Sequence, residues 1–217
     1  MKNPVIVGLI AAKGAGKDSL AAAMAGLGYT RLAFADALYA EAADAYDCTV
    51  ASLQVRETKE SPQLWLSPSV CRNKDFAMFC EDYLAAEGRT GGDQAPMSPR
   101  EVLQQWGTFR RQTDKDYWLK QVENVLRSPE SSGMKFVVTD VRFANEATRV
   151  ESLGGALVRI RRKTAEDAAA GDMHPSETEL RSRATRYTVD NNGTLEDLEV
   201  AALQLVAAVE AAGIAAA

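Results

Sequence analysis

The start of the chain limits the possible folds most strongly, because an apolar run passes there through a glycine-containing loop into a helical pattern. The run is Val5 to Ile10, the loop contains Gly14 and Gly16, and an Ala-rich helical pattern covers residues 20–27. Strand, glycine loop and helix in this order are typical of a phosphate-binding loop. We therefore expect this stretch to hold the phosphates of a nucleotide.

The residue types in the loop suit that role. Gly14 and Gly16 allow the backbone to turn its N–H groups toward one point, and the N-terminus of the following helix adds positive potential there. Lys17 supplies a mobile positive charge that can reach the β- and γ-phosphates.

The loop departs from the usual pattern G-x-x-x-x-G-K-[ST] at two positions, since Ala11 and Asp18 replace the first glycine and the hydroxyl residue. We expect the Asp18 carboxylate to serve a cation directly or through water, and Ser19 to donate to a phosphate. The alternative is a glycine-containing turn with no ligand. The register of strand, loop and helix favours the phosphate loop.

Composition and charge exclude several classes of protein. The 217 residues suit one large domain with an inserted lobe, and a net charge of −5 gives no basic footprint for a nucleic-acid polymer. No apolar run approaches the ~20 residues that span a bilayer, and the early first strand leaves no room for a signal peptide. Cys48, Cys71 and Cys80 lack metal-site spacing, which favours reduced thiols in a cytoplasm. The lone histidine, His174, excludes a His-rich metal site.

Two further strands are predicted to end in carboxylates. Residues 29–34 read as a short strand before Asp36, and residues 135–139 read as a buried strand before Asp140. Asp36 caps the following helix, contacts a substrate, or does both, since open α/β sheets bind ligands at the carboxyl ends of their strands. We expect Asp140 to hold Mg²⁺ or its water shell, with Arg142 projecting from the same strand end.

A helix with a polar face is predicted after Ser98. Ser98 to Glu101 combines a capping serine, a proline at the first position and a glutamate that closes a capping box. Arg100, Gln104 and Arg111 recur at spacings of four and seven, so they share one helix face. Gly107-Thr108 inside the helix is costly by propensity and favours a binding face over a solvated one.

The region at about 49–97 reads as a helical insertion without a long linker, and a polar segment at about 162–183 follows another strand, 156–161. Basic residues that leave a strand into such a segment indicate a lid over phosphates. His174 lies in this segment, either in the active site or as a capping residue on the surface. The alternation of strands and helices predicts an α/β fold, with a parallel sheet between helical layers.

Together these motifs resemble the deoxynucleoside monophosphate kinases encoded by bacteriophages, a P-loop nucleoside monophosphate kinase-like family. The matching pieces are KGAGKDS (13–19), LQQWGT (103–108), TDVRF with NEA (139–147), HPSE (174–177) and DNNGTLEDL (190–198). They keep their order over nearly the whole chain, except in the 49–97 region.

The resemblance implies a three-layer P-loop NTPase fold and transfer of a phosphoryl group from ATP, with Mg²⁺, to a deoxynucleoside 5′-monophosphate. It implies the following roles: Lys13, Gly14, Ala15, Gly16, Lys17, Asp18 and Ser19 for the ATP phosphates and magnesium, with Asp140; Asp36, Arg100, Gln104, Thr108, Arg111, Arg142 and His174 for the acceptor; Arg161 and Arg162 for the lid; Asn191 and Asn192 for the adenine side.

The partners implied are small-molecule nucleotides, without nucleic-acid polymer or membrane, in the cytoplasm (the host cytoplasm for a phage-encoded chain). A homodimer through the Ala-rich C-terminal helix is one expectation. Two alternatives stay open at this point. One is another small-molecule P-loop kinase, such as a dephospho-coenzyme A kinase or phosphomevalonate kinase, and the other is an ATP-binding module without an acceptor.

Overall fold

The computed structural model describes residues 3–169 and 178–212. The chain forms two compact units, of which the first comprises Met1–Phe34 and Gln121–Ala217 and the second Ala35–Lys120. The insertion predicted at 49–97 falls within the second unit, and the single-domain organisation stays a prediction.

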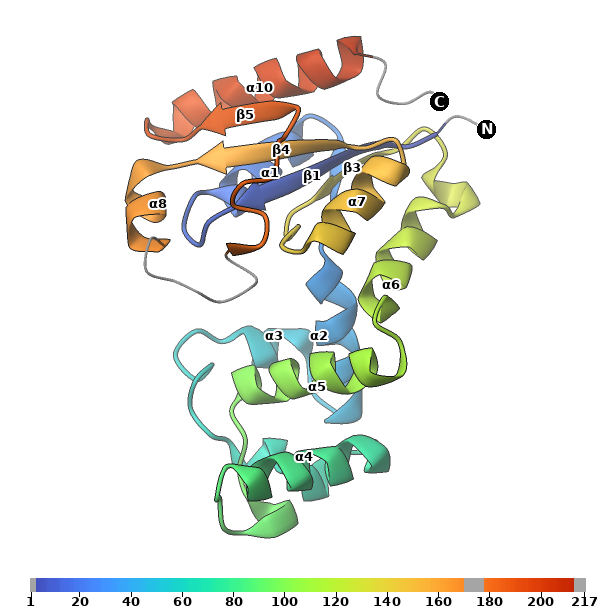
Figure 1. The fold of residues 1–217 in the computed structure, drawn as a ribbon, viewed down its shortest axis with the longest axis vertical. Helices are drawn as coiled ribbons and strands as arrows, with labels where there is room; N and C mark the ends of the chain where they lie inside the picture. Colours follow the sequence, from blue (N-terminus) through green and yellow to red (C-terminus); the bar gives the residue numbers. More distant parts are fainter. Residues whose placement is uncertain (1–2, 170–177, 213–217) are drawn as a thin grey trace. The chain divides into compact units, whose positions relative to one another are not determined.

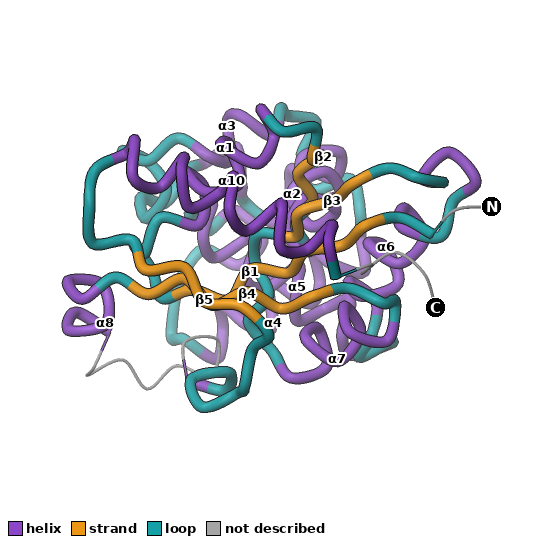
Figure 2. Tube along the Cα trace, turned by 90° about the horizontal axis from the view of Figure 1, so that it is seen from above, coloured by secondary structure: helices purple, strands orange, loops and turns teal. Residues whose placement is uncertain are grey.

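The first unit is built on a five-stranded sheet in which every pairing is parallel, in the order β2-β3-β1-β4-β5 (Figure 2). The predicted parallel α/β sheet is therefore confirmed. Gly8 of the central strand pairs with Val138 on one side and with Leu157 on the other. The strands are β1 Val5–Ala11, β2 Tyr29–Leu32, β3 Lys135–Val138, β4 Ala156–Arg161 and β5 Tyr187–Asp190.

Helices cover both faces of this sheet, because the central strand is apolar on both sides. Val7 and Leu9 face the core shared with α1 (Lys17–Gly26) and α10 (Leu195–Ala211). Gly8 faces the other way, where a Cβ would lie 3.1 Å from the Val150 side chain of α7 (Ala144–Ser152). Figure 1 shows α10 and α7 on opposite sides of the strands. These three layers are the predicted arrangement.

The strand order places a reversal next to β1. The chain runs from β1 through α1 to the edge strand β2 on one side, and from β3 through α7 to β4 on the other. Open parallel sheets bind ligands outside the carboxyl ends of the strands at such a switch point. The loop that follows β1 lies at this point.

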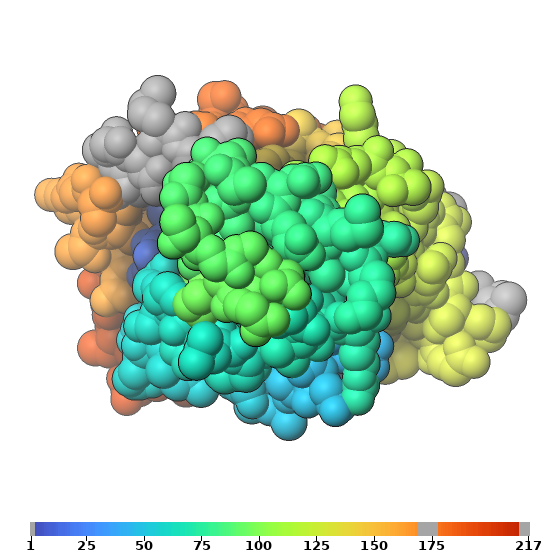
Figure 3. Space-filling view, turned by 90° about the horizontal axis from the view of Figure 1, so that it is seen from below, coloured from blue at the N-terminus to red at the C-terminus, as the bar shows by residue number. Residues whose placement is uncertain are grey.

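The second unit is helical, and Figure 3 views its surface (light blue to green) from below. Its core is aromatic: Phe76 packs 4.5 Å from Trp106 and 5.5 Å from Phe109 between ring centroids. Trp65 is 37% exposed and is not part of this core. The helices are α2 Phe34–Ala45, α3 Val50–Gln54, α4 Lys74–Ala86, α5 Pro99–Thr113 and the start of α6 Tyr117–Leu126, with the short η1 Leu64–Leu66, η2 Pro68–Val70 and η3 Gly92–Gln94.

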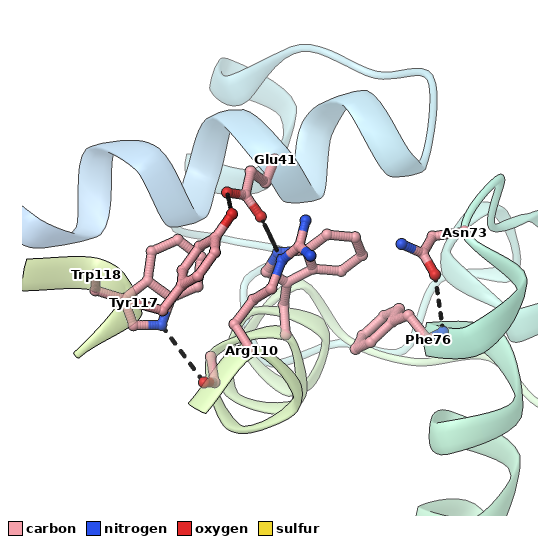
Figure 4. A network of polar contacts seen from close by, with 8 residues as sticks. Glu41, Asn73, Phe76, Arg110, Tyr117 and Trp118 are labelled. Atoms are coloured by element: carbon pink, nitrogen blue, oxygen red, sulfur yellow. Dashed lines mark hydrogen bonds and ion pairs between the residues drawn. The ribbon is translucent and has the colours of Figure 1, made fainter. Parts of the chain in front are cut away.

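One carboxylate joins three helices of the second unit (Figure 4). Glu41 of α2 accepts hydrogen bonds from Trp106 Nε1 at 3.0 Å, Arg110 Nε at 2.7 Å and Tyr117 Oη at 2.5 Å. The Arg110 guanidinium also stacks on both aromatic rings. Hydrogen bonds to a charged acceptor in a half-buried place are strong, so this network fixes α5 against α2 and α6.

The capping box expected at Ser98 and Glu101 forms at the start of α5. A second capping box, Thr194 with Asp197, begins α10. The remaining short helices are η4 Pro129–Ser131 and α8 Lys163–Ala169. Within the described ranges, no helix combines the length and apolarity needed to cross a membrane.

Candidate active site

The glycine loop adopts the conformation that the sequence predicts. Gly14 and Gly16 have φ angles of +83° and +96°, values that favour glycine over any residue with a side chain. Helix α1 begins directly after Gly16, at Lys17. The loop therefore brings backbone N–H groups and a helix N-terminus to the carboxyl end of β1, which suits an anion.

Lys17 and Asp18 contact each other in this loop. Lys17 Nζ lies 2.7 Å from Asp18 Oδ2, and the Asp18 side chain is 73% exposed. An exposed pair of this kind contributes at most about 1 kcal/mol. The Lys17–Asp18 pair is therefore weak enough to be exchanged for another partner of Lys17. Lys13 and Ser19, also predicted to bind here, are exposed on the same loop and first helical turn.

Asp140 follows β3 and contacts a distant part of the chain. Its Oδ1 accepts a hydrogen bond at 2.8 Å from the backbone N–H of Phe34, the first residue of α2. This contact satisfies an N–H at the start of the helix. The alternative in which Asp36 caps this helix is wrong, because α2 begins at Phe34 and Asp36 lies within its first turn.

The carboxyl ends of β4 and β5 carry the predicted lid and adenine-side residues. Arg161 ends β4, is exposed, and pairs with Glu166 at 3.3 Å. Arg162 follows, and its carbonyl accepts from the first turn of α8. The Asn192 Oδ1 accepts from the Lys163 N–H at 2.9 Å, so the turn after β5 holds the start of α8.

Asn191 contacts the glycine loop itself, which sequence reasoning missed. Its Nδ2 donates to the Ala15 carbonyl at 2.8 Å, and its backbone N–H donates to the Arg161 carbonyl at 2.7 Å. The residue is 8% exposed. The motif DNNG indicates a turn, and nothing in it predicts a bond to a residue so far away in the sequence.

Arg159 anchors the chain beyond residue 177 to the sheet. Its Nη2 donates to the carbonyls of Leu180 at 2.8 Å and Arg183 at 2.7 Å, and burial lowers the pKa of its guanidinium. Arg183 in turn pairs with Glu151 at 2.5 Å. The predicted lid at 162–183 lies partly outside the described residues. His174 belongs to the part that is not described.

The donor-side candidates lie at one edge of the sheet in the first unit, because the carboxyl ends of parallel strands meet at the same edge. Arg161 ends β4, and the others follow β1, β3 and β5: Lys17, Asp140 and Asn191. The described residues contain no cluster of three potential metal ligands. The oxygen donors of Asp18, Ser19 and Asp140 nevertheless suit Mg²⁺, which normally takes one or two carboxylates and completes its shell with phosphate oxygens and water.

The acceptor-side candidates on α5 share one exposed face in the second unit. Arg100, Gln104, Thr108 and Arg111 are all exposed. Arg100 pairs with Glu60, and its backbone N–H donates to the Lys59 carbonyl at 3.0 Å. Glu60 comes from the 49–97 region, where no sequence pattern singles it out.

Gly107 of α5 lies beside the Arg111 side chain. A Cβ at this position would lie 3.2 Å from Arg111 Nη1, so the end of this flexible side chain would have to shift slightly. Without a Cβ there, the Arg111 guanidinium lies back along the helix. Arg142, the remaining acceptor candidate, is exposed in the first unit, and its backbone N–H donates to Glu146 at 2.7 Å.

Comparison with known proteins yields one family and several partial likenesses. The deoxynucleotide monophosphate kinase family matches residues 20–201. A protein of Acanthamoeba polyphaga mimivirus that carries a provisional deoxynucleotide monophosphate kinase name is 45% identical over 62 residues. Those residues are 28% of this chain and 31% of that protein, so the match spans about a third of the relative's length.

Two solved structures are similar to the chain at low sequence identity. The crystal structure of TT1252 from Thermus thermophilus is 21% identical, with a TM-score of 0.42, covering 95% of this chain and 98% of the other. Dephospho-CoA kinase from Campylobacter jejuni is 12% identical, with a TM-score of 0.46, covering 94% and 96%.

Proposed function

Because the chain belongs to the deoxynucleotide monophosphate kinase family, we propose that it transfers the γ-phosphoryl group of ATP to a deoxynucleoside 5′-monophosphate. The products are ADP and the deoxynucleoside diphosphate. The glycine loop between β1 and α1 carries this proposal, since it presents backbone N–H groups, Lys17 and a helix N-terminus at one strand end.

The chemistry asks little covalent work of the protein. The bond between the γ-phosphorus and the oxygen bridging to ADP breaks, while a phosphate oxygen of the acceptor forms the new bond. That phosphate is ionised near neutral pH, so no general base is required. Lys17 and the loop N–H groups balance charge on the donor phosphates, and Arg161 and Arg162 add positive charge from the end of β4.

Magnesium fits the proposed donor site. Asp18, Ser19 and Asp140 would hold it, directly or through water. When bound, the ion supplies neutralisation of the charge on the phosphate oxygens. Removal of divalent cations by a chelator should stop turnover, and added Mg²⁺ should restore it.

The acceptor is assigned to the polar face of α5. Arg100 and Arg111 carry the forked guanidinium that pairs with phosphate oxygens, and Gln104 and Thr108 supply neutral hydrogen bonds on the same face. Asp36, Arg142 and His174 are further candidates for acceptor contacts. Asn192 is a candidate on the adenine side of the donor.

The proposed partners are small-molecule nucleotides rather than a nucleic-acid polymer or a membrane, in keeping with the net charge of −5. The proposed setting is the cytoplasm, or that of the host if a bacteriophage encodes the chain.

A homodimer through α10 is a separate proposal, which light scattering across a range of concentrations tests directly.

An acceptor panel tests the proposed activity. The chain is incubated with ATP, Mg²⁺ and each deoxynucleoside and ribonucleoside monophosphate, and ADP release is followed in a coupled assay. We expect ADP release that depends on at least one deoxynucleoside monophosphate. ADP release that no acceptor stimulates would indicate an ATPase module, and stimulation by dephospho-coenzyme A or phosphomevalonate alone would indicate another small-molecule kinase.

Lys17→Ala tests the donor side of the same proposal. We expect turnover to fall about 10²–10³-fold, because a positive charge on the transferring group is lost. Lys135→Ala is the matched control, since Lys135 also forms a 2.6 Å ion pair, with Glu210, but at the amino end of β3. Equal turnover in both variants would contradict the donor role of Lys17.

A further inference from the structure

The peptide group between Ala15 and Gly16 is held by a side chain from the far end of the sequence. Asn191 Nδ2 donates to the Ala15 carbonyl at 2.8 Å. Asn191 itself is fixed, because its backbone N–H donates to the Arg161 carbonyl at 2.7 Å and only 8% of the residue is exposed. The glycine loop is therefore held by the turn after β5 as well as by its own strand and helix.

A held carbonyl determines the direction of the neighbouring N–H. In a planar trans peptide the C=O and N–H bonds point in opposite directions. Because the Ala15 carbonyl points to Asn191, the Gly16 N–H points to the opposite edge of the peptide. A flipped peptide would turn the carbonyl oxygen, with its partial negative charge, to the place where the N–H now points.

The fit between Asn191 and the loop requires glycine at position 16. A Cβ on Gly16 would lie 2.2 Å from Asn191 Nδ2, and Gly16 has a φ angle of +96°. At Gly14 the φ angle is +83°, but a Cβ would meet nothing within 4 Å. The side-chain amide of Asn191 thus takes the space in which a side chain at position 16 would lie.

We propose that Asn191 is a positioning residue for the donor phosphates, acting through the loop rather than through the base. Its amide holds the Ala15–Gly16 peptide so that the Gly16 N–H faces the phosphates of ATP. This inference rests on the proposed function for the identity of the ligand. It departs from the sequence expectation that Asn191 serves the adenine.

Two variants remove the contact in different ways. Asn191→Asp keeps the shape but replaces the Nδ2 donor with an oxygen, which repels the Ala15 carbonyl and favours the flipped peptide. Asn191→Ala removes the donor and leaves the peptide without a partner. Ser131→Ala is the matched control, because Ser131 is also buried in the first unit and its hydroxyl donates to a carbonyl, that of Val125, at 2.6 Å.

The test measures binding of Mg·ATP, tripolyphosphate and adenosine to each full-length variant by calorimetry, with folding checked by circular dichroism. Asn191→Asp is expected to weaken the binding of ATP and of tripolyphosphate by a similar factor of at least tenfold, while the binding of adenosine stays unchanged. The KM of this variant for the monophosphate acceptor should also be unchanged. Ser131→Ala should bind all three ligands as the unaltered chain does. Asn191→Ala should show a smaller loss in the same direction.

Two results would overturn the inference. Loss of adenosine and ATP binding with tripolyphosphate unchanged would make Asn191 an adenine contact, and unchanged binding of all three would leave it no positioning role. The proposed function fails separately, if the unaltered chain binds ATP but transfers no phosphoryl group to any monophosphate.

Discussion

Gly14 and Gly16 share a backbone conformation but differ in their surroundings, and this difference has a measurable consequence. Both φ angles are positive, so alanine at either position costs about 1–2 kcal/mol of backbone strain. At Gly16 the new Cβ would also meet the Asn191 amide, whereas at Gly14 it would meet nothing within 4 Å. The two glycines therefore play different parts in the same loop.

We expect Gly16→Ala to lower the free energy of unfolding more than Gly14→Ala, by a further 1–3 kcal/mol or so, because a buried amide has to move. Chemical denaturation of both variants measures the difference. In an Asn191→Ala background the extra cost should shrink, as expected for two residues in contact. An equal loss of stability in the two glycine variants would mean that the Asn191 amide does not restrict the space at position 16.

At the scale of elements, the Glu41 network makes a prediction about α5. Glu41→Gln removes the negative charge from the acceptor, so the hydrogen bonds from Trp106 and Arg110 go to a neutral amide oxygen and Arg110 loses its ion pair. We expect a loss of about 1–3 kcal/mol, as for other buried hydrogen bonds to charge. The loss is measured by denaturation followed through tryptophan fluorescence.

The control for this prediction is Arg72→Ala in the same unit. Arg72 pairs with Asp47 at 2.6 Å, but the side chains are 58% and 73% exposed, so its removal should cost less than about 1 kcal/mol. If Arg72→Ala costs as much as Glu41→Gln, the Glu41 network is not what holds α5 in place.

The elements themselves follow closely from local signals in the sequence. Pro99–Thr113 forms the helix predicted after Ser98, and Ala156–Arg161 forms the predicted strand. Capping residues and apolar runs act within a few residues, so the sequence displays them directly. The start of α2 is the exception, since the Asp140 carboxylate that satisfies it comes from 106 residues away.

The candidate site also contains residues that local patterns reveal and contacts that only the fold creates. Glycine, lysine and arginine positions can be read from motifs, because their spacing along one loop or helix is fixed by local geometry. The contacts of Asn191 with Ala15 and of Arg100 with Glu60 join residues 176 and 40 positions apart. Only the fold brings such pairs together, and no spacing rule predicts them.

At the scale of the molecule, the three cysteines act as reporters of the second unit, since all of them lie within it. Cys71 and Cys80 are buried, and burial raises the pKa of both thiols above the usual value of 9.0. Cys48 is half-buried and its pKa is also raised by burial. In the folded chain, few of these thiols are ionised at neutral pH.

We expect a thiol reagent at pH 8 to modify Cys48 first, and Cys71 and Cys80 only as the second unit opens, because the thiolate is the reactive form. Single cysteine-to-serine variants show which thiol reacts in each phase of the modification. Rapid modification of all three thiols would contradict their burial.

A raised thiol pKa in the folded state also means that the free energy of unfolding declines as the pH rises above about 9, where the thiols of the unfolded chain ionise.

The proposed donor nucleotide, Mg·ATP, provides the corresponding reporter for the first unit, which holds the glycine loop and the strand ends. A ligand that binds only the folded state stabilises it by about 2.7 kcal/mol at a hundred times its Kd. Mg·ATP should therefore raise the unfolding temperature by several degrees, and tripolyphosphate should do so in part. Lys17→Ala should lose most of this shift while Lys135→Ala keeps it, because only Lys17 lies at the carboxyl edge of the sheet. An equal shift in both variants would show that the nucleotide stabilises the chain from some other place than the glycine loop.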